Sequence, residues 1–125
     1  MNEKFDLQER LIDLAVRVLK VCDSLPDTVA GRHIASQLIR SGTAVAPNYG
    51  EAQGAESRAD FAHKVGVALK EMRETHVWLR IILKAGMIEK TEKLQPLLKE
   101  AGELVAILFA SATTAKRNNS KKTGK

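Results

Sequence analysis

The residues that could carry metal or acid–base chemistry are few, and their spacing does not suit it. The chain has three histidines, His33, His63 and His76, and none of them follows a glutamate by three positions. Di-iron bundles place Glu-x-x-His motifs on facing helices, so this pattern argues against a metal site. We interpret His76, which flanks an apolar stripe, as a hydrogen-bonded core or interface residue.

Nucleophile and phosphate-binding motifs are also missing from the sequence. Cys22, the single cysteine, lies in an apolar helical pattern, which predicts a reduced and buried thiol. No nucleophile elbow and no glycine-rich phosphate loop is present. Close helix packing and a turn explain Gly42, Gly50 and Gly54. The sequence therefore predicts a protein that is not an enzyme and that uses no cofactor.

Polar residues instead gather along two predicted helices. Asn48 keeps the phase of Ile34, Leu38 and Val45, which places it on the core side of its helix. Because an unpaired buried polar group costs about 1–3 kcal/mol, we hypothesise a polar seam in which arginine or lysine pairs with glutamate. The seam would fix helix register or contribute to a subunit interface. The alternative is a solvated face with local pairs. The predicted members are Arg40, Asn48, Glu51, Lys70, Glu71 and Glu74.

Tyr49 and Trp78, the single tyrosine and the single tryptophan, stand beside the main apolar stripes. Aromatic side chains are enriched at interfaces, so both are candidates to fill a groove between helices or between subunits. An ordinary position at the edge of a bundle explains them equally well.

Four amphipathic segments must position these side chains, because apolar residues recur at steps of three and four in each. The first and third begin with capping-box patterns at Asp6 and Ser57. Pro47 lies inside the second segment and predicts a kink; two helices separated by a break are the alternative. Gly86 is the predicted stop of the third helix. The segments cover residues 6–24, 28–53, 57–85 and 91–115.

Four helices of comparable length joined by short loops pack best as an antiparallel up-down-up-down bundle. A chain of 125 residues suits one domain with one core. With 44% hydrophobic and only 4% aromatic residues, that core is expected to consist of Leu, Ile, Val and Ala. We therefore predict an all-α four-helix bundle over residues 1–115, with the second helix kinked near Pro47.

The net charge of +5 lies entirely in residues 116–125, which we predict to be a disordered tail. The tail has five of the 20 basic residues and no acidic one, which leaves 15 basic and 15 acidic residues in 1–115. A basic tail suits phosphate groups or an acidic partner, whereas a solvated end that aids solubility is the alternative. The candidate nucleic-acid contacts are Lys116, Arg117, Lys121, Lys122 and Lys125.

Nothing in the sequence indicates export or membrane insertion. The first residues are charged and lack the apolar stretch of a signal peptide. No apolar run approaches the roughly 20 residues that cross a bilayer. We expect a cytoplasmic protein without a membrane partner.

The segment around Pro47 also carries a resemblance to a known family. Residues 35–53 read ASQLIRSGTAVAPNYGEAQ. With the motifs that follow, this run resembles the bacterial family of the 23S rRNA intervening-sequence protein over residues 7–112. Ala44 stands where serine is common in the family and Gly50 where a larger residue is common, and the basic tail lies outside the resemblance. The following motifs are Ser57 with Asp60-Phe61, Ala68-Leu69-Lys70-Glu71, Glu74-Thr75 and Trp78-Leu79.

The resemblance implies a small antiparallel bundle that assembles into a ring, expected to be a homopentamer. Members of the family are often encoded within rRNA intervening sequences, and their biochemical role is largely unassigned. A related bundle is the accessory variability determinant of diversity-generating retroelements. It is also pentameric, and it binds nucleic acid and a reverse transcriptase through a positive surface.

Three functions are open at this point. The first is a non-enzymatic oligomeric bundle that binds RNA or DNA through positive charge, with several tails multiplying weak contacts. The second is a protein-binding scaffold or adaptor with no nucleic-acid role. An enzyme with a site between subunits is the least favoured. The candidate partners are further copies of the chain, a nucleic acid and another protein.

Overall fold

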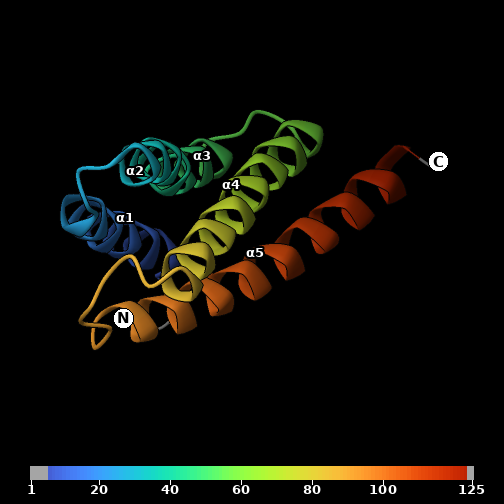
Figure 1. Ribbon diagram of the computed structural model, residues 1–125. Coiled ribbons are helices and arrows are strands. Elements are labelled where there is room, and N and C mark those ends of the chain that lie inside the picture. The colour runs from blue at the N-terminus through green and yellow to red at the C-terminus, as the bar shows by residue number, and fades with distance from the viewer. Residues whose placement is uncertain (1–5, 124–125) are drawn as a thin grey trace.

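The computed structural model describes the backbone of residues 6–123 and the side chains of residues 6–120. Within this range the chain is all-helical and has no strand, which confirms the predicted fold class (Figure 1). The helices are α1 (Leu7–Ser24), α2 (Val29–Gly42), α3 (Val45–Gln53), α4 (Arg58–Lys84) and α5 (Leu94–Thr123). These five helices form a bundle of four rods, because α2 and α3 follow one another along the second rod while α1, α4 and α5 each form a rod of their own.

Local capping signals set the ends of two rods as predicted. The Asp6 side chain accepts a 3.1 Å hydrogen bond from the N–H of Glu9 and opens α1. The Ser57 hydroxyl accepts a 3.0 Å bond from the N–H of Asp60 and opens α4. Gly86 follows the end of α4 with a φ of 64°, a left-handed conformation that glycine adopts without steric cost.

The second rod is bent, as Pro47 predicts, and the bend divides it into α2 and α3. Pro47 has no N–H, so the carbonyl of Thr43, one turn earlier, loses its helical partner. Thr43 and Ala44 lie between the two helices and keep right-handed backbone angles. The N–H of Ala44 bonds to the carbonyl of Ser41 at 3.2 Å, which makes a tighter turn than the α-helix.

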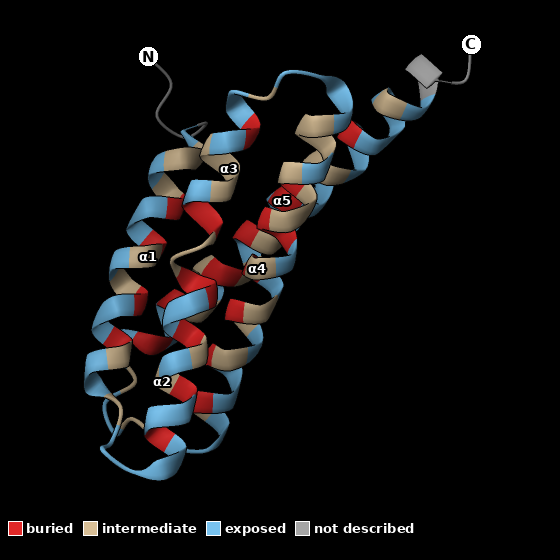
Figure 2. Cartoon of the chain, turned by 90° about the horizontal axis from the view of Figure 1, so that it is seen from above, coloured by how far each residue is buried: buried red, intermediate tan, exposed pale blue. Residues whose placement is uncertain are grey.

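The last helix is longer than predicted. α5 continues to Thr123, so the prediction that it ends and frays after Ala115 is wrong. No proline or glycine interrupts residues 103–123, and Lys and Arg are good helix formers. Arg58 Nη1 also donates a 3.5 Å hydrogen bond to the carbonyl of Asn118, which ties this part of α5 to the start of α4. The last turns of α5 project beyond the other helices (Figures 1 and 2).

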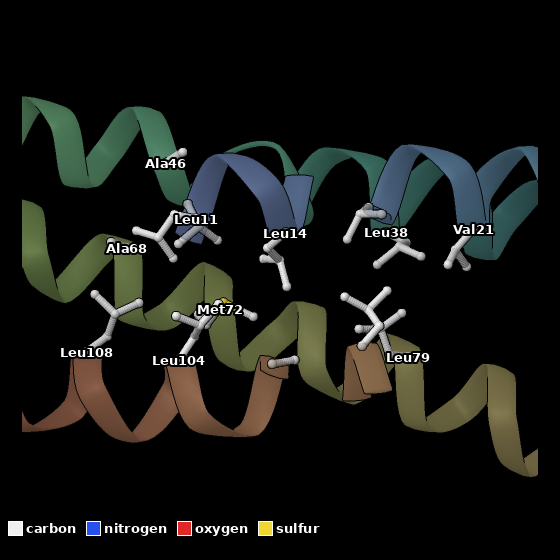
Figure 3. Packing of buried hydrophobic residues seen from close by; sticks show 14 of the residues in the cluster. Leu11, Leu14, Val21, Leu38, Ala46, Ala68, Met72, Leu79, Leu104 and Leu108 are labelled. Carbon is white, nitrogen blue, oxygen red and sulfur yellow. The ribbon is translucent and has the colours of Figure 1, made fainter. Parts of the chain in front are cut away.

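The core is built mainly from leucine and runs along the inside of all four rods. Figure 3 shows Leu14 of α1, Leu38 of α2, Met72 of α4 and Leu104 of α5 converging on the same interior. The side chains of these residues are fully buried, and each buried side chain of this size stabilises the fold by about 1.5–3 kcal/mol. α4 packs against α5, α3 and α2, while α1 packs against α2, α3 and α5. The aliphatic core predicted from the composition is confirmed.

The contact between α1 and α2 depends on a glycine. A Cβ placed on Gly42 would lie 2.7 Å from Cγ1 of Val18, closer than carbon atoms pack in proteins. The absence of a side chain at Gly42 therefore allows the two helices to approach at this level. The prediction that Gly42 serves close helix packing is confirmed.

None of the helices between residues 6 and 123 combines the length and the apolar character that a bilayer crossing requires.

Candidate functional site

An arginine on α2 joins two glutamates on α4. Arg40 Nη1 lies 3.1 Å from Glu71 Oε1, and Arg40 Nη2 is hydrogen-bonded to Glu74 Oε2. Trp78 Nε1 donates a 3.3 Å hydrogen bond to the same Glu74 oxygen. The Arg40 guanidinium holds the pKa of Glu74 below its usual value and helps keep the carboxylate ionised. The structure thus brings together three residues of the predicted seam, and Trp78 joins them.

Directly beneath this ion pair lies a polar contact that the sequence did not single out. Thr75 Oγ1 is 2.9 Å from Ser41 Oγ and 2.9 Å from the carbonyl oxygen of Glu71. Ser41 and Thr75 have no exposed surface. Both residues keep the phase of their apolar stripes. That periodicity is the sequence signal that could have predicted their burial. The α2–α4 contact therefore has a hydroxyl pair inside and an arginine–glutamate cluster outside.

The remaining members of the predicted seam lie elsewhere. Asn48 Nδ2 donates a 2.8 Å hydrogen bond to the carbonyl of Ala44 in its own rod, so its amide needs no charged partner. Glu51 is largely exposed and pairs with Lys64 Nζ at 3.2 Å instead of with Arg40. Lys70 is exposed on α4. The six predicted members therefore do not form one seam, because Asn48 and Glu51 have partners other than Arg40.

The two aromatic candidates differ in their surroundings. Trp78 packs edge-to-face on His33 of α2, with ring centroids 6.2 Å apart, and therefore fills a groove between α2 and α4. Tyr49 is half-buried against the core. Beside it, a Cβ on Gly50 would lie 3.2 Å from Gln8 Nε2, which donates a 3.2 Å hydrogen bond to the carbonyl of Ala46. A residue larger than glycine at position 50 would press on this α1–α3 contact.

The basic residues on the outer face of α4 have no carboxylate within ion-pair distance in the described part of the chain. Arg73 lies over the ring of Phe109, 5.5 Å from its centroid, and Lys70, Arg80 and Lys84 extend into solvent.

By contrast, Arg10 of α1 pairs with Glu100 of α5 at 2.8 Å and with Glu103 at 3.1 Å.

The predicted tail is described only in part. Lys116 and Arg117 are exposed on the helical extension of α5. The side chains of Lys121 and Lys122, and the whole of Lys125, lie outside the described residues. The tail's predicted role therefore stays a prediction.

The groups that could carry acid–base or thiol chemistry are dispersed. His76 is half-buried beside Gly102 of α5, and burial followed by the nearby Arg80 charge lowers its pKa. Cys22 is only partly buried, although the sequence predicts a buried thiol. Its Sγ lies 3.7 Å from the carbonyl oxygen of Ala35, and burial raises its pKa. Between residues 6 and 120, no three His, Cys, Asp or Glu side chains are grouped as metal ligands.

Comparison with known proteins gives one family. The model of the family described as 23S rRNA-intervening sequence protein matches residues 3–110. A crystal structure of a protein of unknown function from Bacteroides thetaiotaomicron, described as a member of the S23 ribosomal protein family, is similar. It is 29% identical with a TM-score of 0.75, over 85% of this chain and 97% of that chain. No protein with a curated description matches the chain.

Proposed function

The chain belongs to the 23S rRNA-intervening sequence protein family, and from this premise we propose that it is a non-enzymatic, self-associating bundle that binds RNA or DNA through positive charge. The observation that carries the proposal is the sorting of charge on α4. Glu71 and Glu74 turn toward α2 and are paired with Arg40. The cations of the outer face are exposed and have no carboxylate in ion-pair distance among the described residues, and they are Lys70, Arg73, Arg80 and Lys84.

These four cations form one basic strip. Their spacing of three, seven and four residues keeps them on one side of a helix, and Lys70 and Lys84 are separated by about 21 Å along the axis. Lys116 and Arg117 extend the positive surface onto the free end of α5. A nucleic acid presents closely spaced phosphates, so a strip of this length would neutralise several of them and release their counterions.

Binding to a fluorescein-labelled RNA, followed by anisotropy at increasing salt, tests this function. We expect the logarithm of the affinity to fall linearly with the logarithm of the salt concentration. Replacing Lys70, Arg80 and Lys84 by glutamine should reduce the slope by about three, roughly one for each phosphate contact. Arg73 is retained because it packs on Phe109.

The matched control is Lys99→Gln, which removes an exposed cation from α5 outside the strip. It should leave the slope unchanged, because Lys99 is not among the proposed phosphate contacts. An unchanged slope in the triple variant would remove the strip from the proposal, and deletion of residues 116–125 would then show whether the tail alone binds.

We propose self-association because α1 exposes an apolar stripe. Ile12, Val16 and Leu19 lie four and three residues apart on one face of α1, and they are 39%, 44% and 40% exposed. Contiguous apolar surface on a small protein commonly marks an interaction site. Following the family resemblance, we propose a homopentamer whose neighbouring subunits cover this stripe.

A protein-binding scaffold is the second candidate, and one observation favours it. Val77 and Ile81 are exposed between the cations of α4, and Phe109, whose ring lies under Arg73, is 52% exposed. A surface that mixes apolar and cationic side chains also suits an acidic protein partner. Binding that persists at 1 M salt, where charges are screened within about 3 Å, would favour this function over nucleic-acid binding.

A further inference from the structure

A groove opens at the end of the bundle where α1 ends and α5 begins. Its volume is about 860 Å³, which suits a small organic molecule. Three segments that are far apart in the sequence form it: the last two turns of α1, the α4–α5 loop and the first turn of α5. The lining residues lie between Arg17 and Ser24 and between Ile88 and Leu97.

The floor of the groove is apolar. Val21, Leu94 and Leu97 are buried members of the core that also line the groove, and Ile88 is half-buried against them. Pro96 adds an apolar ring with no N–H. A floor of this kind favours the hydrocarbon part of a ligand, because contact with it removes apolar surface from water.

The rim of the groove is cationic. Arg17, Lys20, Lys90 and Lys93 lie on it, against a single acidic residue, Glu92. None of these five side chains is in an ion pair with another described residue. Four like charges around one opening repel each other, and a bound anion would offset that repulsion.

Among the described residues, Arg17 at the rim lacks the acidic partners that Arg10 has on the same helix. Arg10 and Arg17 are seven residues apart and lie on the same face of α1. Arg10 meets the carboxylates of Glu100 and Glu103 on α5. Arg17 and Lys93 both line the groove. Because α5 runs antiparallel to α1, the position seven residues before Glu100 is the counterpart of Arg17, and that position holds the cation Lys93.

We propose that this groove binds a small organic anion that consists of an apolar body and one carboxylate, sulfonate or phosphate group. The anionic group lies between Arg17 and Lys93. It pairs with Arg17 as the carboxylate of Glu100 pairs with Arg10. The apolar body lies over Val21, Ile88 and Leu97. The positive end of α5, which begins at Leu94, adds to the attraction.

Isothermal titration calorimetry with octyl phosphate, kept below the concentration at which it forms micelles, tests the proposal. Inorganic phosphate has the anionic group alone, and octyltrimethylammonium has the same tail with the opposite charge. We expect octyl phosphate to bind at least about tenfold more tightly than either. Equal binding of inorganic phosphate would show that the apolar floor has no part, and equal binding of octyltrimethylammonium would show that the cations have none; each result would overturn the proposal.

The double variant Arg17→Gln/Lys93→Gln locates the site. We expect it to weaken octyl phosphate binding by about tenfold or more, because two charge-assisted contacts are lost. Circular dichroism should show unchanged helicity, since both residues are on the rim and not in the core. The control Lys70→Gln/Lys116→Gln removes two exposed cations far from the groove and should change affinity by less than about twofold. Unchanged affinity in the first variant, or an equal loss in the control, would contradict the proposal.

Discussion

At the scale of single residues, the hydroxyl pair between α2 and α4 is the most informative contact. Ser41 and Thr75 are fully buried, and their oxygens are 2.9 Å apart. A buried polar group is tolerated only while it has a partner. Each hydroxyl has the other as a partner, in addition to a carbonyl of its own helix. The pair thereby favours the one alignment of α2 and α4 in which both hydroxyls meet.

Replacing both members of this pair should cost less than the sum of the two single replacements. Thr75→Val keeps the shape of the side chain but leaves the Ser41 hydroxyl with only a 3.4 Å contact to the carbonyl of Leu38. We expect the free energy of unfolding in urea to fall by about 1–2 kcal/mol. In Ser41→Ala/Thr75→Val no hydroxyl is left unpaired, and the loss should be smaller than the sum of the single losses. Strictly additive losses would show that the two hydroxyls do not stabilise each other.

At the scale of helices, much of the fold could be predicted because helix signals are local. Capping at Asp6 and Ser57, the bend before Pro47 and the stop at Gly86 each depend on residues within one or two turns. The end of α5 was missed because no local signal stops a helix between Ala115 and Thr123. Such a stretch of Lys, Asn and Ser is polar without being a helix terminator.

The candidate site was only partly predictable, because it depends on how neighbouring helices are rotated. Arg40, Glu71 and Glu74 were all predicted members of the seam, and the structure joins these three across the α2–α4 contact. Glu51 pairs with Lys64, which was not among the predicted members of the seam. Lys64 lies on α4, and sequence periodicity alone does not show which charges of α3 and α4 meet across the contact between the two helices.

Replacing two helical glycines by alanine should change the free energy of unfolding in opposite directions. A Cβ on Gly66, in the middle of α4, would meet nothing within 4 Å, so Gly66→Ala should raise the free energy of unfolding by about 0.5–1 kcal/mol through helix propensity. A Cβ on Gly42 would lie 2.7 Å from Val18, so Gly42→Ala should lower it by about 1–3 kcal/mol through overpacking. Urea unfolding of both variants makes the comparison. A loss of stability with Gly66→Ala would mean that another chain approaches α4 at this position.

At the scale of the whole molecule, three surfaces separate on the bundle. The apolar stripe lies along α1, the basic strip lies along the outer face of α4, and the cationic groove is at the end where α1 meets α5. Each is tested by different substitutions. Self-association through α1, nucleic-acid binding through α4 and anion binding in the groove could therefore fail or succeed independently of one another.

If the chain assembles through α1, a single substitution there should reduce the mass of the particle in solution. Sedimentation equilibrium of the protein should give five times the 13.7 kDa chain mass. Val16→Glu places a charge at the centre of the stripe, and desolvating that charge in an interface without a partner would cost more than the interface gains there. The variant should sediment as a single chain with unchanged helicity, because Val16 is not part of the core.

The control for this experiment is Val29→Glu. Val29 is 79% exposed, more than Val16, but it stands at the start of α2, outside the stripe. This variant should keep the mass of the assembly, since a charge on a fully solvated position costs little. A Val16→Glu protein that remains assembled would exclude α1 from the interface. A single-chain mass for the unmodified protein would refute the ring, and the exposed stripe would then need another partner.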